Sequence, residues 1–294
     1  MLYERILKRE EINKGWSGDR KFIVTLTDGE RYFLRVTPTS KKENCLKNFD
    51  LQKKWYSLGI PMPIPYEITE QEEGICAIYQ LIDGDILEDC AKTLSKNQRY
   101  KLGVEAGKIL KKIHSLQVID APDWEARFNR KMDRKIDMYL SCEIHYDGAE
   151  RFIEYINANR HLLKDRPQCY QHGDYHVGNI MLRRESLTVI DFDRYDIGDP
   201  WEEFNRIVWT AQAMPELASG MVDGYFDGIP PIEFWRLLAL YISSNTLSSV
   251  PWAIPFGKQE IDVMLNQARE VLYWYDGMKD VVPSWYKFKG LYTS

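Results

Sequence analysis

The stretch that decides the fold runs from Gln171 to Leu182 and reads QHGDYHVGNIML. After six further residues, Val189 to Asp193 reads VIDFD. The first segment presents a polar loop with Asp174 and, five positions later, Asn179 just before a short apolar strand. The second segment is a strand that ends in Asp191. A strand–turn–strand hairpin would bring Asn179 and Asp191 close together, with Asp174 facing the same cleft.

These side chains supply the chemistry that phosphoryl transfer requires. Carboxylate and amide oxygens are hard ligands of the kind that Mg²⁺ accepts together with water and phosphate oxygens. A further carboxylate can orient an attacking hydroxyl group and accept its proton. Asn179 and Asp191 therefore suit a metal site, and Asp174 suits the carboxylate that handles the hydroxyl group. Each residue alone is more often structural, but all three in this order between strands predict a kinase active site.

The same residues resemble a known family. The pattern HGDxxxxN, followed by a strand and IDFD, is similar to the aminoglycoside phosphotransferase and choline-kinase-like family, a relative of the protein-kinase catalytic loop. The match continues through IGDP at residues 197–200. The resemblance implies that Asp174 is the catalytic base or orients the substrate, and that Asn179 and Asp191 bind Mg²⁺. It also implies a protein-kinase-like fold that uses ATP or GTP as phosphate donor.

The resemblance implies supporting roles for neighbouring side chains. His172 would hold the loop through hydrogen bonds, and Asp193 would support the metal ligands or bind the metal weakly. His176 lies next to the loop and is expected either to touch the substrate or to stabilise the loop.

A segment near the N-terminus, KGWSGD at residues 14–19, is predicted to cover the phosphates of the nucleotide. Gly15 and Gly18 lie three positions apart, which lets backbone N–H groups approach phosphates without obstruction by a Cβ atom. Together with Ser17 they are the predicted nucleotide-binding residues of this segment, although alone it would read as a surface turn. The segment LIDG at residues 81–84 resembles the hinge that binds a purine edge, with adenine and guanine both open.

Arg35 stands where a protein kinase places the lysine that holds the α- and β-phosphates. Arginine keeps the positive charge and can bind phosphate through two N–H groups, although its geometry differs from that of lysine. A plain surface position on the strand is the alternative. The candidates for the acidic partner of Arg35 are Glu43 and Asp50 on the following helix. The sequence leaves open which of them, if either, fills this role.

The order of the predicted elements gives an α+β architecture with two lobes. The first third of the chain reads as sheet, with a strong hairpin signal at Asp28–Gly29. We expect strands at 21–27, 31–36, 62–68 and 75–82, and a helix at 41–58. Helical spacing then takes over, for example at 98–116, and after Pro200 prolines are expected to separate the helices. The small β-rich nucleotide-binding lobe is predicted over residues 1–83, and the larger, mainly helical catalytic and acceptor-binding lobe over 84–294.

Composition places the chain among globular proteins. Of 294 residues, 44% are hydrophobic and 28% charged, and the net charge is −5, which argues against disorder and against a general nucleic-acid-binding surface. The five scattered cysteines form no CxxC pair, so neither a disulfide framework nor a structural zinc site is expected. No signal peptide and no apolar run of about 20 residues is evident. We therefore expect a cytoplasmic protein without a nucleic-acid or membrane partner.

The acceptor is predicted to be a small hydroxylated molecule. The segment between Asp191 and Asp199 is too short for the activation loop with which protein kinases dock a polypeptide. The best single prediction, implied by the family resemblance, is an aminoglycoside-type antibiotic, whose ammonium groups carboxylates would bind. The mildly acidic composition also suits a cationic acceptor, but it carries little weight because many proteins share it. Choline or ethanolamine, homoserine, fructosamine and macrolides stay open, as does the oligomeric state. The acidic candidates are Glu202, Glu203, Asp223, Asp227, Glu260 and Asp262, each of which is more often a solvated helix residue.

Two other functions compete with a small-molecule kinase. A non-catalytic nucleotide-binding pseudokinase is suggested by the arginine at position 35. The retention of Asp174, Asn179 and Asp191 argues against it, because a protein freed from catalysis has no chemical need of all three. A protein kinase is disfavoured by the missing activation loop.

Overall fold

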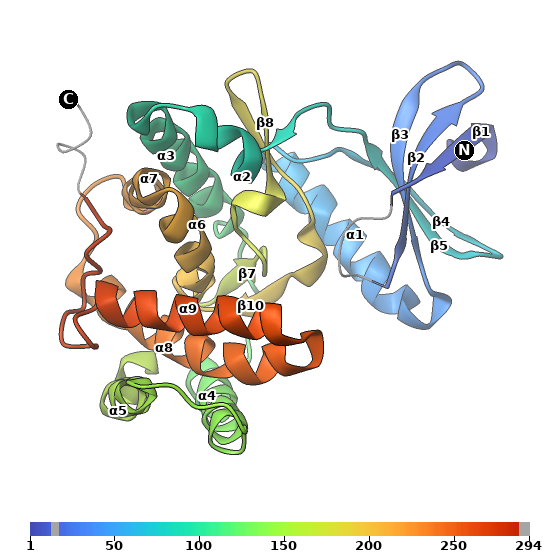
Figure 1. Ribbon diagram of the computed structural model, residues 1–294. Helices are drawn as coiled ribbons and strands as arrows, with labels where there is room; N and C mark the ends of the chain where they lie inside the picture. The colour runs from blue at the N-terminus through green and yellow to red at the C-terminus, as the bar shows by residue number, and fades with distance from the viewer. Residues whose placement is uncertain (13–17, 288–294) are drawn as a thin grey trace. The chain divides into compact units, whose positions relative to one another are not determined.

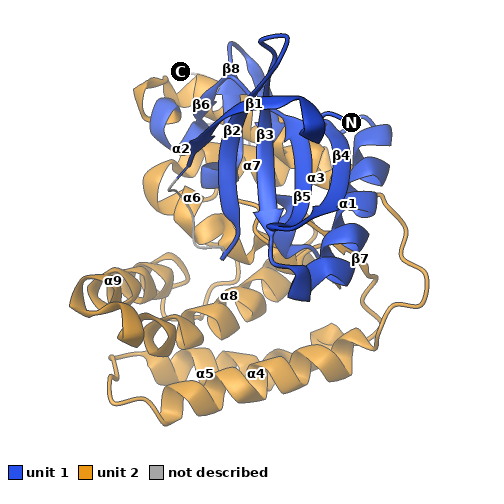
Figure 2. Cartoon of the chain, turned by 90° about the vertical axis from the view of Figure 1, so that its right-hand side faces the viewer, with its two compact units in different colours: residues 1–90, 177–195 blue, residues 91–176, 196–294 orange. Residues whose placement is uncertain are grey.

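The computed structural model describes residues 1–12 and 18–287. They form two compact units (Figure 2). The first unit contains residues 1–90 and 177–195, and the second contains residues 91–176 and 196 onward. These two units do not coincide with the lobes predicted at residues 1–83 and 84–294. The assignment of a nucleotide-binding lobe and a catalytic lobe to those ranges stays a prediction.

The first unit is built on a five-stranded antiparallel sheet in the order β1-β2-β3-β5-β4 (Figure 1). Strands β2 and β3 form the predicted hairpin, in which Gly29 has a φ of 88° and donates its N–H to the Leu26 carbonyl at 3.0 Å. This left-handed conformation favours glycine. Strand β1, which was not predicted, pairs with β2 along the sheet edge. The strands are β1 (Ile6–Glu11), β2 (Arg20–Leu26), β3 (Arg31–Thr37), β4 (Pro65–Gln71) and β5 (Gly74–Gln80).

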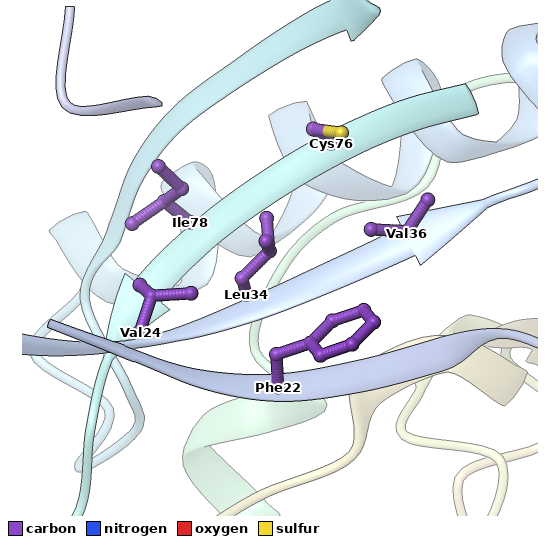
Figure 3. Close-up of a cluster of buried hydrophobic side chains, with 6 residues drawn as sticks. All are labelled: Phe22, Val24, Leu34, Val36, Cys76 and Ile78. Atoms are coloured by element: carbon purple, nitrogen blue, oxygen red, sulfur yellow. The ribbon is translucent and has the colours of Figure 1, made fainter. Parts of the chain in front are cut away.

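Side-chain alternation gives this sheet two different faces. One face carries a buried apolar cluster, shown in Figure 3, formed by Phe22, Val24, Leu34, Val36, Cys76 and Ile78. On the opposite face, Ala77 and Tyr79 pack against Phe49 of helix α1 (Lys42–Ser57), with Phe33 beside them. Because Arg35 alternates with Leu34, it lies on the α1 face, where its side chain is enclosed.

Residues 177–195 return to the first unit as a hairpin of β8 (Ile180–Arg183) and β9 (Ser186–Val189). Ile180 pairs with Val189, and this register agrees with the hairpin predicted between Asn179 and Asp191. The Val189 N–H donates to the Pro61 carbonyl at 2.8 Å, which fastens the hairpin to the rest of the unit. Beside β8 lie the short strand β6 (Asp85–Ile86) and helix α2 (Leu87–Cys90).

The second unit is mainly helical. Its long central helix α8 is largely buried and packs against α4, α5 and α9. A two-stranded antiparallel sheet of β7 (Cys169–Gln171) and β10 (Asp196–Gly198) flanks the HGD loop. The helices are α3 (Lys96–Ile113), α4 (Trp124–Leu140), α5 (Ala149–Asn159), α6 (Ile207–Ala213), α7 (Pro215–Phe226), α8 (Ile232–Ala253) and α9 (Lys258–Trp274). Within the described ranges, no helix has the length and apolar character needed to cross a membrane.

Helices α3 and α7 approach each other closely because glycines meet at their contact. Gly103 and Gly107 on α3 lie against α7, which contributes Gly220 and Gly224. A Cβ atom at Gly107 would lie only 2.0 Å from the Met221 carbonyl oxygen, and one at Gly220 would lie 2.2 Å from the Tyr100 carbonyl oxygen. The absence of side chains at these positions is therefore what permits this helix spacing.

Two features of this unit differ from the sequence prediction. Helix α4 was not predicted, although Asp123 caps its N-terminus and Trp124, Phe128 and Met132 recur four residues apart on its buried side. Pro251 does not end a helix but lies inside α8. It lies in the last turn of that helix, and only two residues follow it before the helix ends at Ala253.

Candidate active site

The β8–β9 hairpin places two predicted metal ligands at the same end. Asn179 immediately precedes β8, and Asp191 follows β9 with one residue, Ile190, between them. The Ile190 N–H donates to the Asn179 carbonyl at 2.9 Å, so the two chain segments are joined at this point. Asp191 adopts a left-handed conformation with a φ of 64°, and its side chain remains 40% exposed. The hairpin thus brings an amide and an accessible carboxylate to one edge.

This donor set fits a hard divalent cation that also keeps water and phosphate ligands. Asn179 and Asp191 offer oxygen donors, and Asp193 lies two residues beyond. Over residues 1–12 and 18–287, no three His, Cys, Asp or Glu side chains are arranged to hold a metal by themselves. A metal bound at this edge would need further oxygens from a ligand, as Mg²⁺ does when it is bound with nucleotide phosphates.

Arg35 lies at the centre of a carboxylate cluster within the first unit. Its Nε donates to Asp19 Oδ2 at 2.7 Å, its Nη1 lies 3.5 Å from Asp191 Oδ1, and it also forms an ion pair with Asp193. Glu43 pairs instead with Lys47 at 2.7 Å, and neither Glu43 nor Asp50 contacts Arg35. Arg35 is therefore a buried, carboxylate-bound cation next to the proposed metal ligand.

A cavity of about 380 Å³ opens beside this cluster in the first unit. Its charged lining residues are Arg35, Asp191 and Asp193 of this cluster, together with Lys21. Much of the remaining lining is apolar and comes from Ile12, Phe33, Leu81, Ile82, Met181, Ile190 and Phe192. Burial raises the pKa of Tyr79, which also lines the cavity, so its hydroxyl group stays protonated at neutral pH. A largely apolar cavity that also has charged lining residues suits a flat base that carries an anionic tail.

The predicted phosphate-covering segment is only partly described. Gly15 and Ser17 lie outside the described residues. Gly18 is described, and a Cβ atom at this position would meet nothing within 4 Å. Asp19, the next residue, has a side chain that is only 8% exposed and binds Arg35. Sequence reasoning gave Asp19 no role, so this ion pair is a finding of the structure.

Asp174 lies in the second unit on the HGD loop. Its Oδ1 is 3.6 Å from Arg206 Nε and 3.7 Å from His176 Nε2. Its N–H donates to Nδ1 of the fully buried His172 at 3.3 Å, and Gly173 between them has a φ of 85°. The hydrogen bond agrees with the loop-holding role expected of His172. It also leaves the Asp174 carboxylate beside two basic side chains.

Glu203 holds the HGD loop through hydrogen bonds to its backbone. Its carboxylate accepts from the N–H groups of His172 at 2.9 Å and Gly173 at 2.5 Å. It also lies 2.8 Å from Nε2 of His114, whose Nδ1 is 3.0 Å from the Tyr225 hydroxyl. A carboxylate only accepts, so His114 carries its proton on Nε2. Burial raises the pKa of Tyr225, so its hydroxyl group stays protonated and donates to Nδ1.

The predicted site residues are thus divided between the two units. Asn179, Asp191 and Arg35 meet in the first unit, whereas Asp174 lies in the second. Glu203 and His114 are buried supports of the loop that carries Asp174, whereas sequence reasoning placed Glu203 among the acceptor-binding candidates. Arg206 was not predicted to have a role. Its position three residues after Glu203 on the same short helical segment was the available signal.

Comparison with known proteins identifies the family of this chain. A family model described as the phosphotransferase enzyme family matches residues 8–235. The chain belongs to this family. It is a phosphotransferase, and the predictions of the family, of its α+β kinase-like fold and of a small-molecule kinase are confirmed. No curated protein sequence is significantly similar to this chain.

Solved structures share the fold at low sequence identity. The apo form of a thermostable mutant of aminoglycoside phosphotransferase APH(4)-Ia is 15% identical, with 92% of this chain and 96% of that chain covered and a TM-score of 0.64. A choline/ethanolamine kinase family protein from Mesorhizobium loti is 14% identical, with coverages of 93% and 91% and a TM-score of 0.64. Amicoumacin kinase hAmiN, bound to AMP-PNP, Ca²⁺ and Ami, is 12% identical, with coverages of 97% and 94% and a TM-score of 0.65.

Proposed function

We propose that this phosphotransferase transfers the γ-phosphate of ATP or GTP to a hydroxyl group of a small molecule, with Mg²⁺ as its metal ion and the cytoplasm as its compartment. The observation that carries the proposal is the β8–β9 hairpin, which holds Asn179 and Asp191 at one end, with Asp191 beside Arg35 in the lining of a largely apolar cavity. Similar folds have been solved with AMP-PNP and Ca²⁺ or with ADP, which supports a nucleotide and a divalent cation.

Each residue has a role that follows from its chemistry. The cavity receives the purine base, and Arg35 binds phosphate oxygens through its guanidinium group. Asn179 and Asp191 hold the metal ion, which when bound supplies positive charge for the transferring phosphate. Asp174 orients the acceptor hydroxyl group and takes its proton. Glu203 fixes the backbone of the loop on which Asp174 stands.

Aminoglycoside-type acceptors remain the prediction with the most support from relatives. Solved structures of similar fold include a ternary complex with ADP and hygromycin B and a complex with GDP and kanamycin. To bind such a polycation, this chain must offer carboxylates near the acceptor site. Several candidates already have partners: Asp223 accepts from Tyr100 and Tyr286, and Glu203 holds the HGD loop.

The test is a panel of acceptors incubated with the purified protein, Mg²⁺ and either ATP or GTP. The panel contains aminoglycosides, choline, macrolides and small sugar alcohols, and both NDP release and product mass are measured. We expect a mass gain of one phosphate on at least one alcohol and loss of NDP release in Asp191→Ala. Asp280→Ala, an exposed carboxylate outside the site, is the matched control and should keep full activity. Nucleotide binding without any Asp191-dependent turnover would favour the pseudokinase instead.

A further inference from the structure

Basic side chains of α4 and of the segment Glu202–Arg206 lie close together in the second unit, and one of them contacts Asp174. Arg206 lies 3.6 Å from Asp174, and Lys131 on α4 lies 2.9 Å from Glu202. The side chains of Arg206 and Lys131 are each 34% exposed, so a ligand can reach them. One turn further along α4, Lys135 is also partly exposed. We call Lys131, Lys135 and Arg206 the basic cluster.

Lys135 is the member of the basic cluster whose partner carries no charge. Its Nζ donates to the side-chain oxygen of Asn245 at 3.3 Å. Burial is the main cause that lowers the pKa of Lys135 from its ordinary value of 10.5 to about 7, and the nearby positive charges of Lys131 and Arg206 lower it further. Glu202 acts in the opposite direction but is already paired with Lys131. Lys135 is thus a partly buried amine whose hydrogen-bond partner is not a carboxylate.

The charges of the basic cluster do not cancel. Three cationic side chains face two carboxylates, because Arg206 is next to Asp174 and Lys131 is next to Glu202. The ion pair with Lys131 keeps the pKa of Glu202 below its usual value although burial would raise it. Glu202 is therefore an anion that is already neutralised. The positive charge in excess is that of the protonated form of Lys135, which a bound anion would favour over the neutral amine.

We propose that the acceptor molecule carries an anionic group, a carboxylate or a phosphate, which binds the basic cluster while its hydroxyl group faces Asp174. This inference rests on the proposed function and names the substrate class of that site. Binding an anion would give Lys135 the opposite charge that it lacks in the protein alone. A polycationic amino sugar would instead be repelled by three neighbouring cations.

The transferring phosphate is the other anion that these side chains could meet. Removal of Lys135 would then slow transfer to every acceptor equally. If the basic cluster binds the acceptor, the loss depends on the charge of the acceptor. The two assignments therefore predict different results in one experiment.

The experiment uses four alcohols of similar size that differ in one end group. They are 1,4-butanediol, 4-aminobutan-1-ol, 4-hydroxybutyrate and 4-hydroxybutyl phosphate. Their dissociation constants are measured without nucleotide on the full chain by ligand-observed NMR, and their phosphorylation is then measured by product mass. We expect one or both anions to bind at least about tenfold more tightly than the diol, because a hydrogen bond to a charged group contributes about 1.5–3 kcal/mol. The carboxylate and phosphate arms identify which anion is preferred.

Two variants locate the effect. Lys135→Met keeps the apolar length of the side chain, and replacing a buried charge by an apolar residue is often tolerated. We expect this variant to lose most of the preference for anions, through a higher Kd and KM. Lys111→Met, which removes an exposed charge on α3, should keep the preference.

Three results would overturn the proposal. They are tighter binding of the amine, equal or undetectable binding of all four alcohols, and an equal loss of transfer to neutral and anionic acceptors in Lys135→Met. The binding arm requires no turnover. A failure of the kinase assignment, in which no nucleotide turnover depends on Asp191, is therefore distinguished from a failure of the anion assignment.

Discussion

Arg35 is the residue at which this chain departs from the lysine of protein kinases. Arg35→Lys keeps the charge but loses the forked geometry, and we expect nucleotide affinity to fall about tenfold, the effect of about one charge-assisted hydrogen bond. Arg35→Met leaves the enclosed Asp19 carboxylate with only Lys41, whose Nζ lies 3.9 Å away, and should destabilise the fold by up to about 3–5 kcal/mol. Nucleotide titration and urea unfolding measure the two effects. The control is Arg31→Lys at the exposed start of the same strand, and unchanged nucleotide affinity in Arg35→Met would refute the assignment.

Glu203 is predicted to act on catalysis through position alone. In Glu203→Gln the new side-chain NH₂ faces an N–H donor, so the loop under Asp174 loses at least one of its hydrogen bonds. We expect a fall of about 1–3 kcal/mol in unfolding free energy and a lower kcat, with little change in KM for the nucleotide. Glu203→Asp should recover part of the kcat.

Steady-state kinetics with Glu233→Gln as the surface control measure this effect. A Glu203→Gln enzyme with unchanged kcat would show that the loop does not need this support.

Lys135 gives the protein a pH-dependent stability. Its pKa is about 7 in the folded chain and 10.5 in the reference state, so between these values the unfolded chain binds more protons than the folded chain. The penalty for burying the charge is full below about pH 7 and disappears as pH rises toward 10.5. We therefore expect the stability of wild type relative to Lys135→Met to increase from pH 7 to pH 10 in urea unfolding. If the difference in unfolding free energy between wild type and Lys135→Met stayed constant with pH, folding would not lower the pKa of Lys135.

Residue positions were predictable where the residues are neighbours in the chain. Asp174, Asn179 and Asp191 lie within one continuous motif, and the hairpin predicted between the latter two is present. The partner of Arg35 was missed, although the register of the β2–β3 hairpin contains it. Lys21 pairs with Arg35, and Asp19, two residues before Lys21, lies on the same face. Glu203 and Arg206 reach the HGD loop only through tertiary folding.

At the scale of elements, the contact between α3 and α7 depends on glycine. In Gly107→Ala the new methyl group would lie 2.0 Å from the Met221 carbonyl, so the helices must separate. We expect a loss of about 1–3 kcal/mol or more in unfolding free energy, as for an overpacked core. Gly228→Ala is the matched control, because its Cβ atom would meet nothing within 4 Å. Equal stability of the two variants would contradict this account of the helix contact.

Helices and strands were predictable from periodicity, with exceptions that have physical reasons. Charged residues lie between the apolar positions along helix α4 and obscure their spacing, yet Trp124, Phe128 and Met132 carry its buried side. Pro251 was expected to end a helix, but near the C-terminal end of α8 the missing N–H and the ring disturb little of the helix. Strand β1 has mostly exposed side chains, so it lacks the apolar alternation that identifies a strand.

At the scale of the whole molecule, the two-unit organisation was harder to predict than the fold class. The change from strands to helices after Gly84 marks a division by secondary structure. Residues 177–195, however, fold back as strands and join the first unit. Only long-range pairing, such as Asp85 with Leu182, creates that return, and a boundary drawn along the sequence does not capture it.

The central claim is that Asp174 serves phosphoryl transfer to a hydroxyl group, and the most direct test is product mass in Asp174→Ala. The variant is incubated with Mg²⁺, nucleotide and the best acceptor of the panel, beside wild type. We predict that transfer falls by at least about 100-fold, because a positioned acid or base contributes about 10²–10⁴ in rate. Nucleotide binding in the first unit should persist. Near-normal phosphorylation of the acceptor by Asp174→Ala would contradict the proposed mechanism.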